Sequence, residues 1–450
     1  MYGWFRDLLP AEVIEAPISS GITVKPRQAP LCTLCRGGKR LCGRSICPIE
    51  LKARALVKNS EAVMKTELSG SSPPAVFVGR YGYPKVSVGP MVPPLSGDTS
   101  VMDIPEAWLS ESIESIVNYR YSLVRGTIRV EIDSAKKGGR MVDLLQELSM
   151  GISPAEAEVR FTRPPAGRIS IDDNSQPFGP SAPLERFDLS SVKVDHRIER
   201  AFYDGDLKAA DAAYSLYSSG VQVSKLQRAF SMGVFGIQKN RRIVPTRWSI
   251  TAVDSMLSQR IIDEVKNYET IDKYCVYFWK HQHNTFAALL FPRAWSFEWM
   301  EAWFPGTFWN QGGSAAAVIG DYEGFSGRKT YPEIGGCYFS CRLGVAEHLR
   351  SERRQATALV VREIMPEFPL PLGVWFVREN IRTMFRQRPL EFEDLAAALR
   401  HLSTRLRVPL RRWVSKSTIL RDAIFQRRID EYFKLGEIQC QATRPQSAGA

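Results

Sequence analysis

The run YCVYFWKHQHNTFAALLF, residues 274–291, decides the fold class of the chain. Aromatic and β-branched residues dominate it, which is typical of strands. Similar runs follow at residues 296–304 (SFEWMEAWF) and 314–320 (SAAAVIG). Residues 273–320 are therefore predicted to form an antiparallel sheet.

Outside this run the sequence patterns change. Apolar residues recur at helical spacing in residues 107–124, 141–150, 206–219, 223–231 and 249–268. The alternation of TIRVEI (127–132) predicts a strand, and residues 340–434 have an almost entirely helical pattern. This mixture favours an α+β, or mixed α/β, fold over a regular alternation of strands and helices.

The length and composition indicate a folded protein with more than one domain. The chain has 450 residues, 44% of them hydrophobic, and a net charge of +12, which excludes a disordered tail protein. The loop-like segment 174–190 is the predicted main boundary. We predict a small four-cysteine metal module with a linker helix (1–70), an α/β domain (71–180), an α+β domain that ends in a helical region (181–425), and a peptide with a tail (426–450).

The N-terminal residues lack a basic segment followed by an apolar run, so no signal peptide is predicted. The longest apolar stretches are far shorter than the roughly 20 residues of a membrane helix. A cytoplasmic protein without membrane contact is expected, because the cysteines are clustered rather than spread as a disulfide framework.

Four cysteines crowd into sixteen residues with the spacing Cys32-x2-Cys35-x6-Cys42-x4-Cys47. A CxxC pair holds one metal ion from a tight turn, and two further thiolates complete a tetrahedral site. Zn²⁺ is the favoured ion. The alternative is an iron–sulfur cluster, because Pro48 follows the last cysteine as in some cluster motifs. A third interpretation is redox-active or inert thiols. A closed four-thiolate site would be structural.

A basic loop at residues 239–254 precedes an expected helix that Ser249 or Thr251 is suited to cap, since Thr251-x-x-Asp254 has the spacing of a capping box. Free amides at a helix N-terminus and guanidinium groups bind phosphate, and an indole stacks on a base. The alternative is a solvated turn with its tryptophan in the core. The candidate phosphate or nucleic-acid ligands are Lys239, Arg241, Arg242, Arg247, Trp248, Ser249 and Thr251.

A Gly-rich segment at residues 77–91 offers Arg80, Tyr81 and Lys85 as further candidate ligands. Its glycines would let the backbone approach a bound molecule. Ordinary turn chemistry explains the same glycines equally well. The same two interpretations apply to residues 312–329.

His283 and Glu298 are the candidate catalytic residues. His281 and His283 have strand spacing and would share one face of a strand, with Glu298 nearby in sequence. The alternative is that these residues have no catalytic role and lie on the surface or in the core. The sequence contains no G-x-S-x-G, Walker A or H-E-x-x-H motif.

Near the C-terminus, Gln426 is followed by Ile429, Tyr432 and Phe433. This is the pattern of a peptide that binds the sliding clamp PCNA. One helical turn places the three apolar side chains on one side as a plug, while the glutamine enters a polar pocket. The alternative is that Ile429 and Phe433 form the buried face of a last helix.

Several sequence blocks together resemble the archaeal Nre family of NreA-type DNA repair proteins. The blocks are LCGRSICPI (41–49), PPAVFVGRYGYPKVSVGP (73–90), QPFGPSAPL (176–184), DHRIERAFYDGDLKAADA (195–212) and VPTRWSITAVD (244–254). The resemblance covers nearly the whole chain. It implies a zinc-type N-terminal module, a function linked to DNA, a C-terminal clamp-binding peptide and an archaeal cytoplasmic setting. The chain departs from the family pattern in its tail, residues 434–450, and the resemblance implies no catalytic mechanism.

Three functions follow from these features. The first is a DNA repair protein that the clamp recruits and that binds DNA or a nucleotide through basic Gly-rich loops. The second is an enzyme acting on a nucleotide or phosphodiester, with a pocket formed by residues 77–91 and 239–254. The third is a non-catalytic adaptor that binds other repair proteins.

Overall fold

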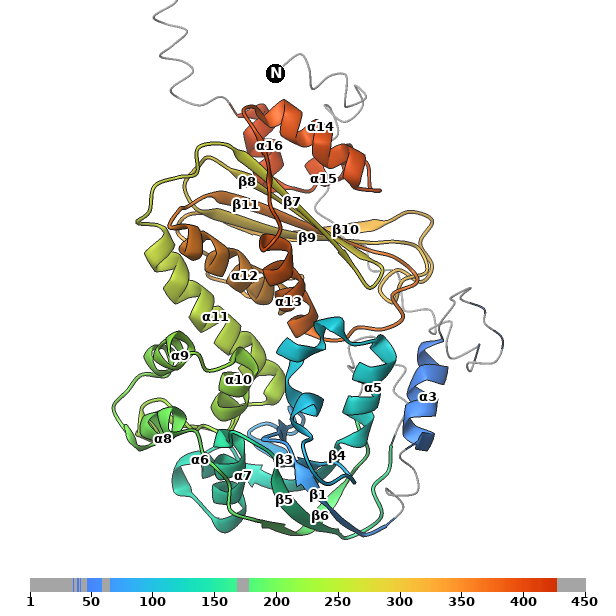
Figure 1. Cartoon of the computed structure of the whole chain (residues 1–450), viewed down its shortest axis with the longest axis vertical. Coiled ribbons are helices and arrows are strands. Elements are labelled where there is room, and N and C mark those ends of the chain that lie inside the picture. Colours follow the sequence, from blue (N-terminus) through green and yellow to red (C-terminus); the bar gives the residue numbers. More distant parts are fainter. Residues whose placement is uncertain are drawn as a thin grey trace, which may run out of the picture.

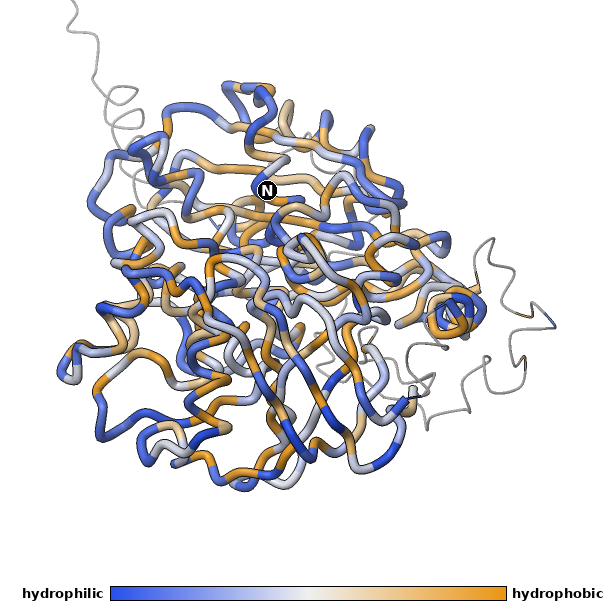
Figure 2. Tube along the Cα trace, turned by 60° about the horizontal axis from the view of Figure 1, so that its bottom comes forward, coloured by the Kyte–Doolittle hydropathy of each residue, from blue (hydrophilic) through white to orange (hydrophobic). Residues whose placement is uncertain are grey.

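Two six-stranded mixed sheets, each packed against helices, make up the described part of the chain (Figure 1). The computed structural model describes residues 35, 39, 41, 47–58, 65–167 and 178–426. The predicted mixed α+β class is confirmed. The interior strands and helices carry most of the apolar residues, and the loops at the edges are mostly polar (Figure 2).

The first sheet has the strand order β1-β5-β6-β4-β3-β2, and only the β4–β6 pairing is parallel. Alternate residues of β5 are buried, because one face of the sheet packs on the core and the other faces solvent. The segment 174–190, predicted to be a loop, contains β6, so that prediction is wrong over residues 181–189. A division at residue 180 would separate β6 from both of its neighbours, β5 and β4. The strands are β1 (Glu67–Ser72), β2 (Val76–Val78), β3 (Lys85–Val92), β4 (Val124–Glu131), β5 (Ala155–Phe161) and β6 (Ser181–Leu189).

The second sheet has the order β10-β9-β11-β8-β7-β12. Its strands β8 and β11 are buried along their whole length, because helices cover both faces of the sheet (Figure 1). This explains why residues 286–291 are continuously apolar. The strands are β7 (Tyr274–His281), β8 (Asn284–Phe291), β9 (Ser296–Trp303), β10 (Ala317–Glu323), β11 (Thr357–Ile364) and β12 (Leu390–Phe392).

The prediction of a helical region over residues 340–434 is wrong at residues 357–364 and 390–392, which form the strands β11 and β12. Strand β11 lies inside that region and inserts between β8 and β9, antiparallel to the first and parallel to the second. The predicted antiparallel pairing is confirmed for β7 with β8 and for β9 with β10. Strand β11 is buried on both faces, so its sequence TALVVREI has no period-2 pattern and cannot be told from a buried helical segment.

Helix α11 connects the two sheets, starting at the first and ending beside the second (Figure 1). The described α-helices are α3 (Pro48–Lys58), α5 (Ile113–Ser122), α6 (Ser134–Lys137), α7 (Arg140–Met150), α8 (His196–Tyr203), α9 (Ala209–Ser218), α10 (Val223–Ser231), α11 (Thr246–Val265), α12 (Cys337–Glu352), α13 (Val374–Phe385), α14 (Leu395–Arg405), α15 (Leu410–Val414) and α16 (Thr418–Phe425). The 3₁₀ helices are η2 (Ser100–Asp103), η3 (Pro105–Ser110) and η4 (Gln238–Asn240). Among the described helices none is long and apolar enough to cross a membrane.

Candidate nucleic-acid interface

The two basic segments that the sequence marks separately lie against each other. The ring centroids of Tyr83 and Trp248 are 5.2 Å apart. The backbone N–H of Val78 donates to Oγ1 of Thr246, the first residue of α11, at 2.9 Å. The turn after β2 is therefore fastened to the start of α11.

The end of β4 fastens the same turn to the loop before α11. The N–H of Ile132 donates to the carbonyl of Pro84 at 3.1 Å, and the N–H of Ile243 donates to the carbonyl of Ile132 at 2.8 Å. These bonds bring Arg242 beside the turn, where its guanidinium lies 3.8 Å from Asp133.

Gly82 is needed for the backbone geometry of this turn. Gly82 has φ +83°, and its carbonyl accepts from the N–H of Lys85 at 2.9 Å. A side chain at Gly82 would collide with the guanidinium of Arg129, which donates to the carbonyl of Tyr81 at 3.0 Å. Turn chemistry therefore accounts for Gly82, and Arg129 joins the candidate residues that the sequence did not single out.

We call this set of exposed side chains the aromatic–cationic surface. Trp248 is 45% exposed and Tyr81 is 76% exposed, so the alternative that placed Trp248 in the core is wrong. Glu131, directly opposite Lys85 in the strand register, and Asp133 are the nearby acids. The surface consists of Arg80, Tyr81, Tyr83, Lys85, Arg129, Lys239, Arg242, Arg247 and Trp248.

Arg241 lies outside this surface, although it sits within the basic loop. It is buried, and its guanidinium donates to main-chain carbonyls of Gly236 and Phe202, both at 2.7 Å, and of Asp204 at 3.0 Å. Burial lowers the pKa of Arg241. These bonds tie the loop to the end of α8, so Arg241 holds the surface in place from beneath.

The predicted helix cap at Ser249 or Thr251 is wrong. Helix α11 begins at Thr246, after Pro245, whose fixed φ suits a helix start. Ser249 is buried and its hydroxyl donates to the carbonyl of Gln227, while the Thr251 hydroxyl donates to the carbonyl of Arg247 at 3.3 Å. The helix starts one turn earlier, which places Arg247 and Trp248 in its first turn.

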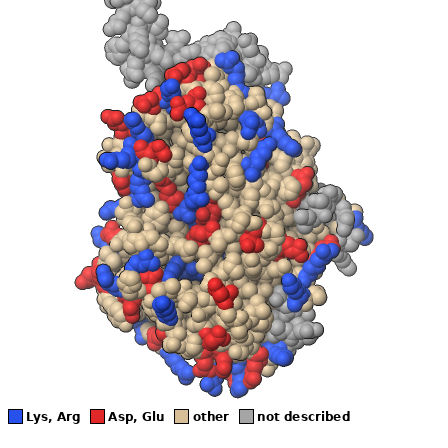
Figure 3. Space-filling view, viewed as in Figure 1, with Lys and Arg blue, Asp and Glu red and all other residues tan. Residues whose placement is uncertain are grey.

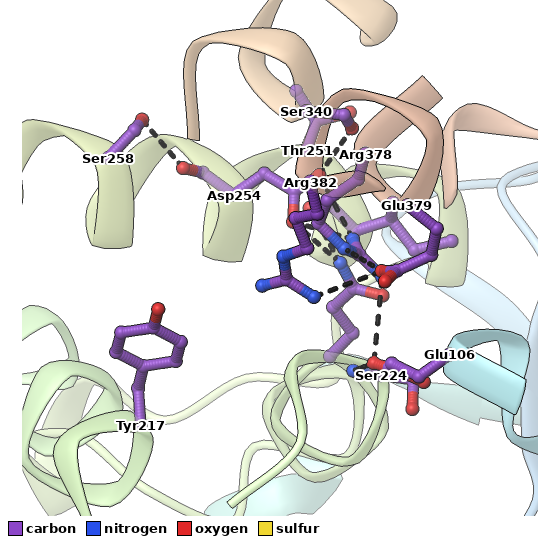
Figure 4. A network of polar contacts seen from close by, with 12 residues as sticks. Glu106, Tyr217, Ser224, Thr251, Asp254, Ser258, Ser340, Arg378, Glu379 and Arg382 are labelled. Carbon is purple, nitrogen blue, oxygen red and sulfur yellow. Dashed lines mark hydrogen bonds and ion pairs between the residues drawn. The ribbon is translucent and has the colours of Figure 1, made fainter. Parts of the chain in front are cut away.

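Asp254 is the centre of a buried network of charges that the sequence reasoning missed (Figure 4). Its carboxylate accepts from Arg378 Nη1 at 3.0 Å, from Gln227 Nε2 at 2.9 Å and from Ser340 Oγ at 2.5 Å. Asp254 and Arg378 are fully buried. Burial raises the pKa of Asp254, and Arg378 opposes that shift.

Arg378 also contacts two other carboxylates. Its Nη2 lies 3.6 Å from Glu106 Oε1, and its Nε donates to Glu379 Oε1 at 3.1 Å. Arg382 extends the network by pairing with Glu347, with N–O distances of 2.6 and 2.7 Å. The network joins η3, α11, α12 and α13, so it fixes the middle of α11 relative to α12 and α13, which pack on the second sheet.

The candidate catalytic residues are far apart. Glu298 on β9 and Leu289 on β8 both pair with Leu359 on β11, so they lie at the same height in the sheet. His283 precedes Leu289 by six residues, which corresponds to about 20 Å along a strand. His283 is exposed in the β7–β8 turn with φ +58°. The two residues do not share a site, and His281 and His283 do not share a strand face.

Glu298 has a structural role at the start of α16. Its buried carboxylate accepts from Ser417 Oγ at 2.5 Å and from the N–H groups of Thr418 and Ile419 at 2.8 and 3.0 Å. A carboxylate on the free amides of a helix N-terminus stabilises that helix. Burial nevertheless raises the pKa of Glu298.

Replacing Glu298 with alanine is expected to lower the free energy of unfolding by about 2 kcal/mol, because three buried donors lose their acceptor. Thermal denaturation monitored by circular dichroism measures the effect. Glu391→Ala, at an exposed position on β12, is the matched control and should change stability little. Equal melting temperatures for the two variants would contradict the capping role.

Most residues of the two remaining predicted sites lie outside the described residues. Cys32 and Cys42 are not described, whereas Cys35 is buried and Cys47 is half-buried just before α3. Within the described ranges, no group of three or more His, Cys, Asp or Glu side chains is arranged to hold a metal. Gln426 ends α16 and is exposed, and Ile429, Tyr432 and Phe433 are not described.

Comparison with known proteins defines the class of this chain. The model of the archaeal Nre N-terminal region matches residues 41–310, and that of the archaeal Nre C-terminal region matches residues 323–432. The chain belongs to the archaeal Nre family. The resemblance inferred from the sequence blocks is therefore confirmed.

Individual relatives extend this match. The chain is 45% identical over 391 residues to the DNA repair protein NreB of Archaeoglobus fulgidus, covering 87% of this chain and 97% of the relative. It is 37% identical to the DNA repair protein NreA of the same organism (83% and 93% covered) and 34% identical to the DNA repair protein NreA of Haloferax volcanii (80% and 88% covered). No solved structure matches the chain.

Proposed function

We propose that this protein acts in DNA repair and binds DNA through the aromatic–cationic surface. The names of the Nre relatives support the repair role. The observation that carries the DNA contact is the pair of exposed rings of Tyr83 and Trp248, in tilted contact with centroids 5.2 Å apart, among exposed cations from three segments of the chain.

The chemistry of this surface suits a nucleic acid. Arginine and lysine neutralise backbone phosphates, and exposed aromatic rings stack on bases. Hydrogen bonds with Ile132 and Thr246 hold the turn, and the buried Arg241 holds the basic loop, so these groups are positioned without a ligand. A preformed site loses little conformational entropy on binding.

Replacing Trp248 with alanine is expected to weaken DNA binding about tenfold, because base stacking on an aromatic side chain contributes about 1–3 kcal/mol. Fluorescence anisotropy with a labelled oligonucleotide at low salt measures the affinity. The control is Tyr203→Ala, an exposed tyrosine at the end of α8 that contacts Phe202. Equal losses in both variants, or none in either, would contradict the proposed surface.

The cations of the surface predict a separate signature. Replacing Arg247 with alanine is expected to weaken binding for every DNA sequence and to reduce the slope of log K against log salt by about 0.7 for a single strand. Arg186→Ala, at an exposed residue of β6 outside the surface, should leave the slope unchanged. Titrations at several salt concentrations give both slopes.

We also propose that the sliding clamp PCNA recruits the protein through Gln426, Ile429, Tyr432 and Phe433. The support is the order of these residues and the position of Gln426, exposed at the end of α16. The clamp-binding peptide would then begin directly after α16, one of the helices that cover the outer face of the second sheet. Other repair proteins would meet this one on the clamp.

The four-cysteine cluster is proposed to hold one Zn²⁺ ion, with an iron–sulfur cluster as the alternative. The support is the spacing of Cys32, Cys35, Cys42 and Cys47. Elemental analysis of purified protein is expected to give one zinc per chain, and Cys47→Ser should abolish it, whereas Cys275→Ser should not. Iron with visible absorbance would support the cluster, and a metal-free protein would contradict both assignments.

A further inference from the structure

We propose that the DNA is single-stranded and that it continues from the aromatic–cationic surface along α11 to the loop between β10 and α12. This inference rests on the proposed DNA binding and names the form of DNA. It assigns Tyr331, Phe325 and Lys329 as further contacts, all of them in the part of the chain matched by the C-terminal family model.

The loop between β10 and α12 follows α11 from its end to its beginning. Phe325 lies under Lys266, just after the last turn of α11, with Nζ 4.9 Å from the ring centroid. At the other end, a methyl group placed on Gly336 would lie 3.0 Å from Thr251 Oγ1 and 3.7 Å from the Tyr331 hydroxyl. Tyr331 therefore lies close to Thr251, one helical turn after Trp248.

The loop is held in this position by its own contacts. Asp321, on β10, accepts from Arg328 Nη2 at 2.9 Å and from the N–H of Ile334 at 2.8 Å. The Arg328 guanidinium also stacks on the ring of Tyr338, in α12. The outward aromatic rings on this loop are therefore presented from a fastened backbone.

Exposed aromatic rings concentrate along this line. Tyr331 is 62% exposed and Phe325 is 52% exposed, with the exposed Lys329 between them and the exposed acid Glu333 beyond. Among the described residues, eight aromatic side chains are classed as exposed, and five of them are Tyr81, Tyr83, Trp248, Phe325 and Tyr331. Single exposed rings are ordinary on a protein surface, whereas exposed apolar groups gathered in one region are typical of an interaction site.

This arrangement fits unpaired bases better than a duplex. Rings stack only on bases whose faces are free, whereas duplex DNA presents phosphates and is bound mainly by broad positive surfaces. On the face in Figure 3, Lys and Arg side chains are interspersed with Asp and Glu and form no single basic patch. Trp248 and Lys266 are about 27 Å apart along the helix axis, which accommodates several nucleotides.

The test compares a labelled 20-residue oligothymidine strand with a 20-base-pair blunt duplex, by anisotropy at one low salt concentration. The proteins are the full chain, Tyr331→Ala, Tyr331→Phe, Trp248→Ala and the control Tyr203→Ala. We expect the full chain to bind the single strand at least about tenfold more tightly than the duplex. Tyr331→Ala should lose about tenfold on the single strand, and Tyr331→Phe should retain binding because its ring remains.

Each other result has a definite meaning. Equal affinity for both DNA forms, with Trp248→Ala weaker and Tyr331→Ala unchanged, would overturn the single-strand path and leave the proposed function standing. Absence of binding to either probe would overturn both. Equal loss in Tyr331→Phe and Tyr331→Ala would show that the ring does not stack and would overturn the contact assigned to it. Melting temperatures of the variants exclude unfolding as a cause.

Discussion

Replacing Arg378 with methionine is expected to lower the free energy of unfolding by about 3–5 kcal/mol. The guanidinium is fully buried among Asp254, Glu106 and Glu379, at 3.0, 3.6 and 3.1 Å. Methionine fills much of the volume but carries no charge. The variant would leave the buried Asp254 and Glu106 without the cation that contacts them, whereas Glu379 keeps Arg382 at 3.0 Å. Uncompensated buried charge costs more than the loss of a surface pair.

The control for this variant is Arg160→Met, on the exposed face of β5. Arg160 pairs with Glu67 at 2.7 Å, and both side chains are more than half exposed. An exposed pair contributes about 0–1 kcal/mol. Urea denaturation of the two variants beside the full chain measures the difference. Equal midpoints would show that the buried network does not hold α11 and α13 together.

The pH dependence of the Arg378→Met defect provides an independent check. Burial raises the pKa of Asp254, and Arg378 opposes this, so its removal raises the folded-state pKa further above the unfolded value. When the pKa of a carboxyl group is higher in the folded than in the unfolded state, the free energy of unfolding falls as the pH rises through the folded-state pKa. The defect relative to the full chain should therefore be larger at about pH 7 than at about pH 4.5.

Replacing both Tyr432 and Phe433 with alanine is expected to weaken binding to a purified archaeal sliding clamp at least about 100-fold. Paired aromatic anchors at an interface commonly contribute about 2 kcal/mol or more each. These residues would form two prongs of the plug, with Ile429 as the third. Calorimetric titration of the full chain and the variant into the clamp measures the loss.

Two controls separate the peptide from its surroundings. Leu435→Ala with Ile438→Ala removes apolar side chains immediately after the pattern and should leave the affinity unchanged. Deleting residues 434–450 should also preserve binding, because the pattern ends at Phe433. Unchanged clamp binding in the Tyr432 and Phe433 double variant would contradict the recruitment proposal.

Parts of the fold follow from local sequence patterns. The aromatic and apolar run over residues 274–291 forms β7 and β8 as predicted, because such runs favour strands buried between helices. Strand β11 was not predictable in this way, since TALVVREI (357–364) stands between helical patterns and has no alternation. The place of β11 is set by partners more than fifty residues away in the chain.

In the candidate site, too, local patterns predict individual residues, whereas contacts between distant segments are not predictable from them. Sequence patterns marked both Tyr81 and Trp248, but the contact between their segments depends on tertiary pairing through Ile132. The Thr251-x-x-Asp254 spacing was misleading, because the partner of Asp254 is Arg378, far along the chain, and no local pattern reports it. Arg241 looked like a phosphate ligand, yet carbonyl groups at the end of α8 engage its guanidinium.

The most direct test of the central claim is to map where DNA touches the protein. Ultraviolet crosslinking of a thymidine-rich single strand, followed by mass spectrometry of the digested protein, identifies the contacting residues. The aromatic–cationic surface predicts crosslinks in the peptides that contain Tyr83 and Trp248. Crosslinks confined to other parts of the chain, such as the outer helices α14–α16, would contradict it.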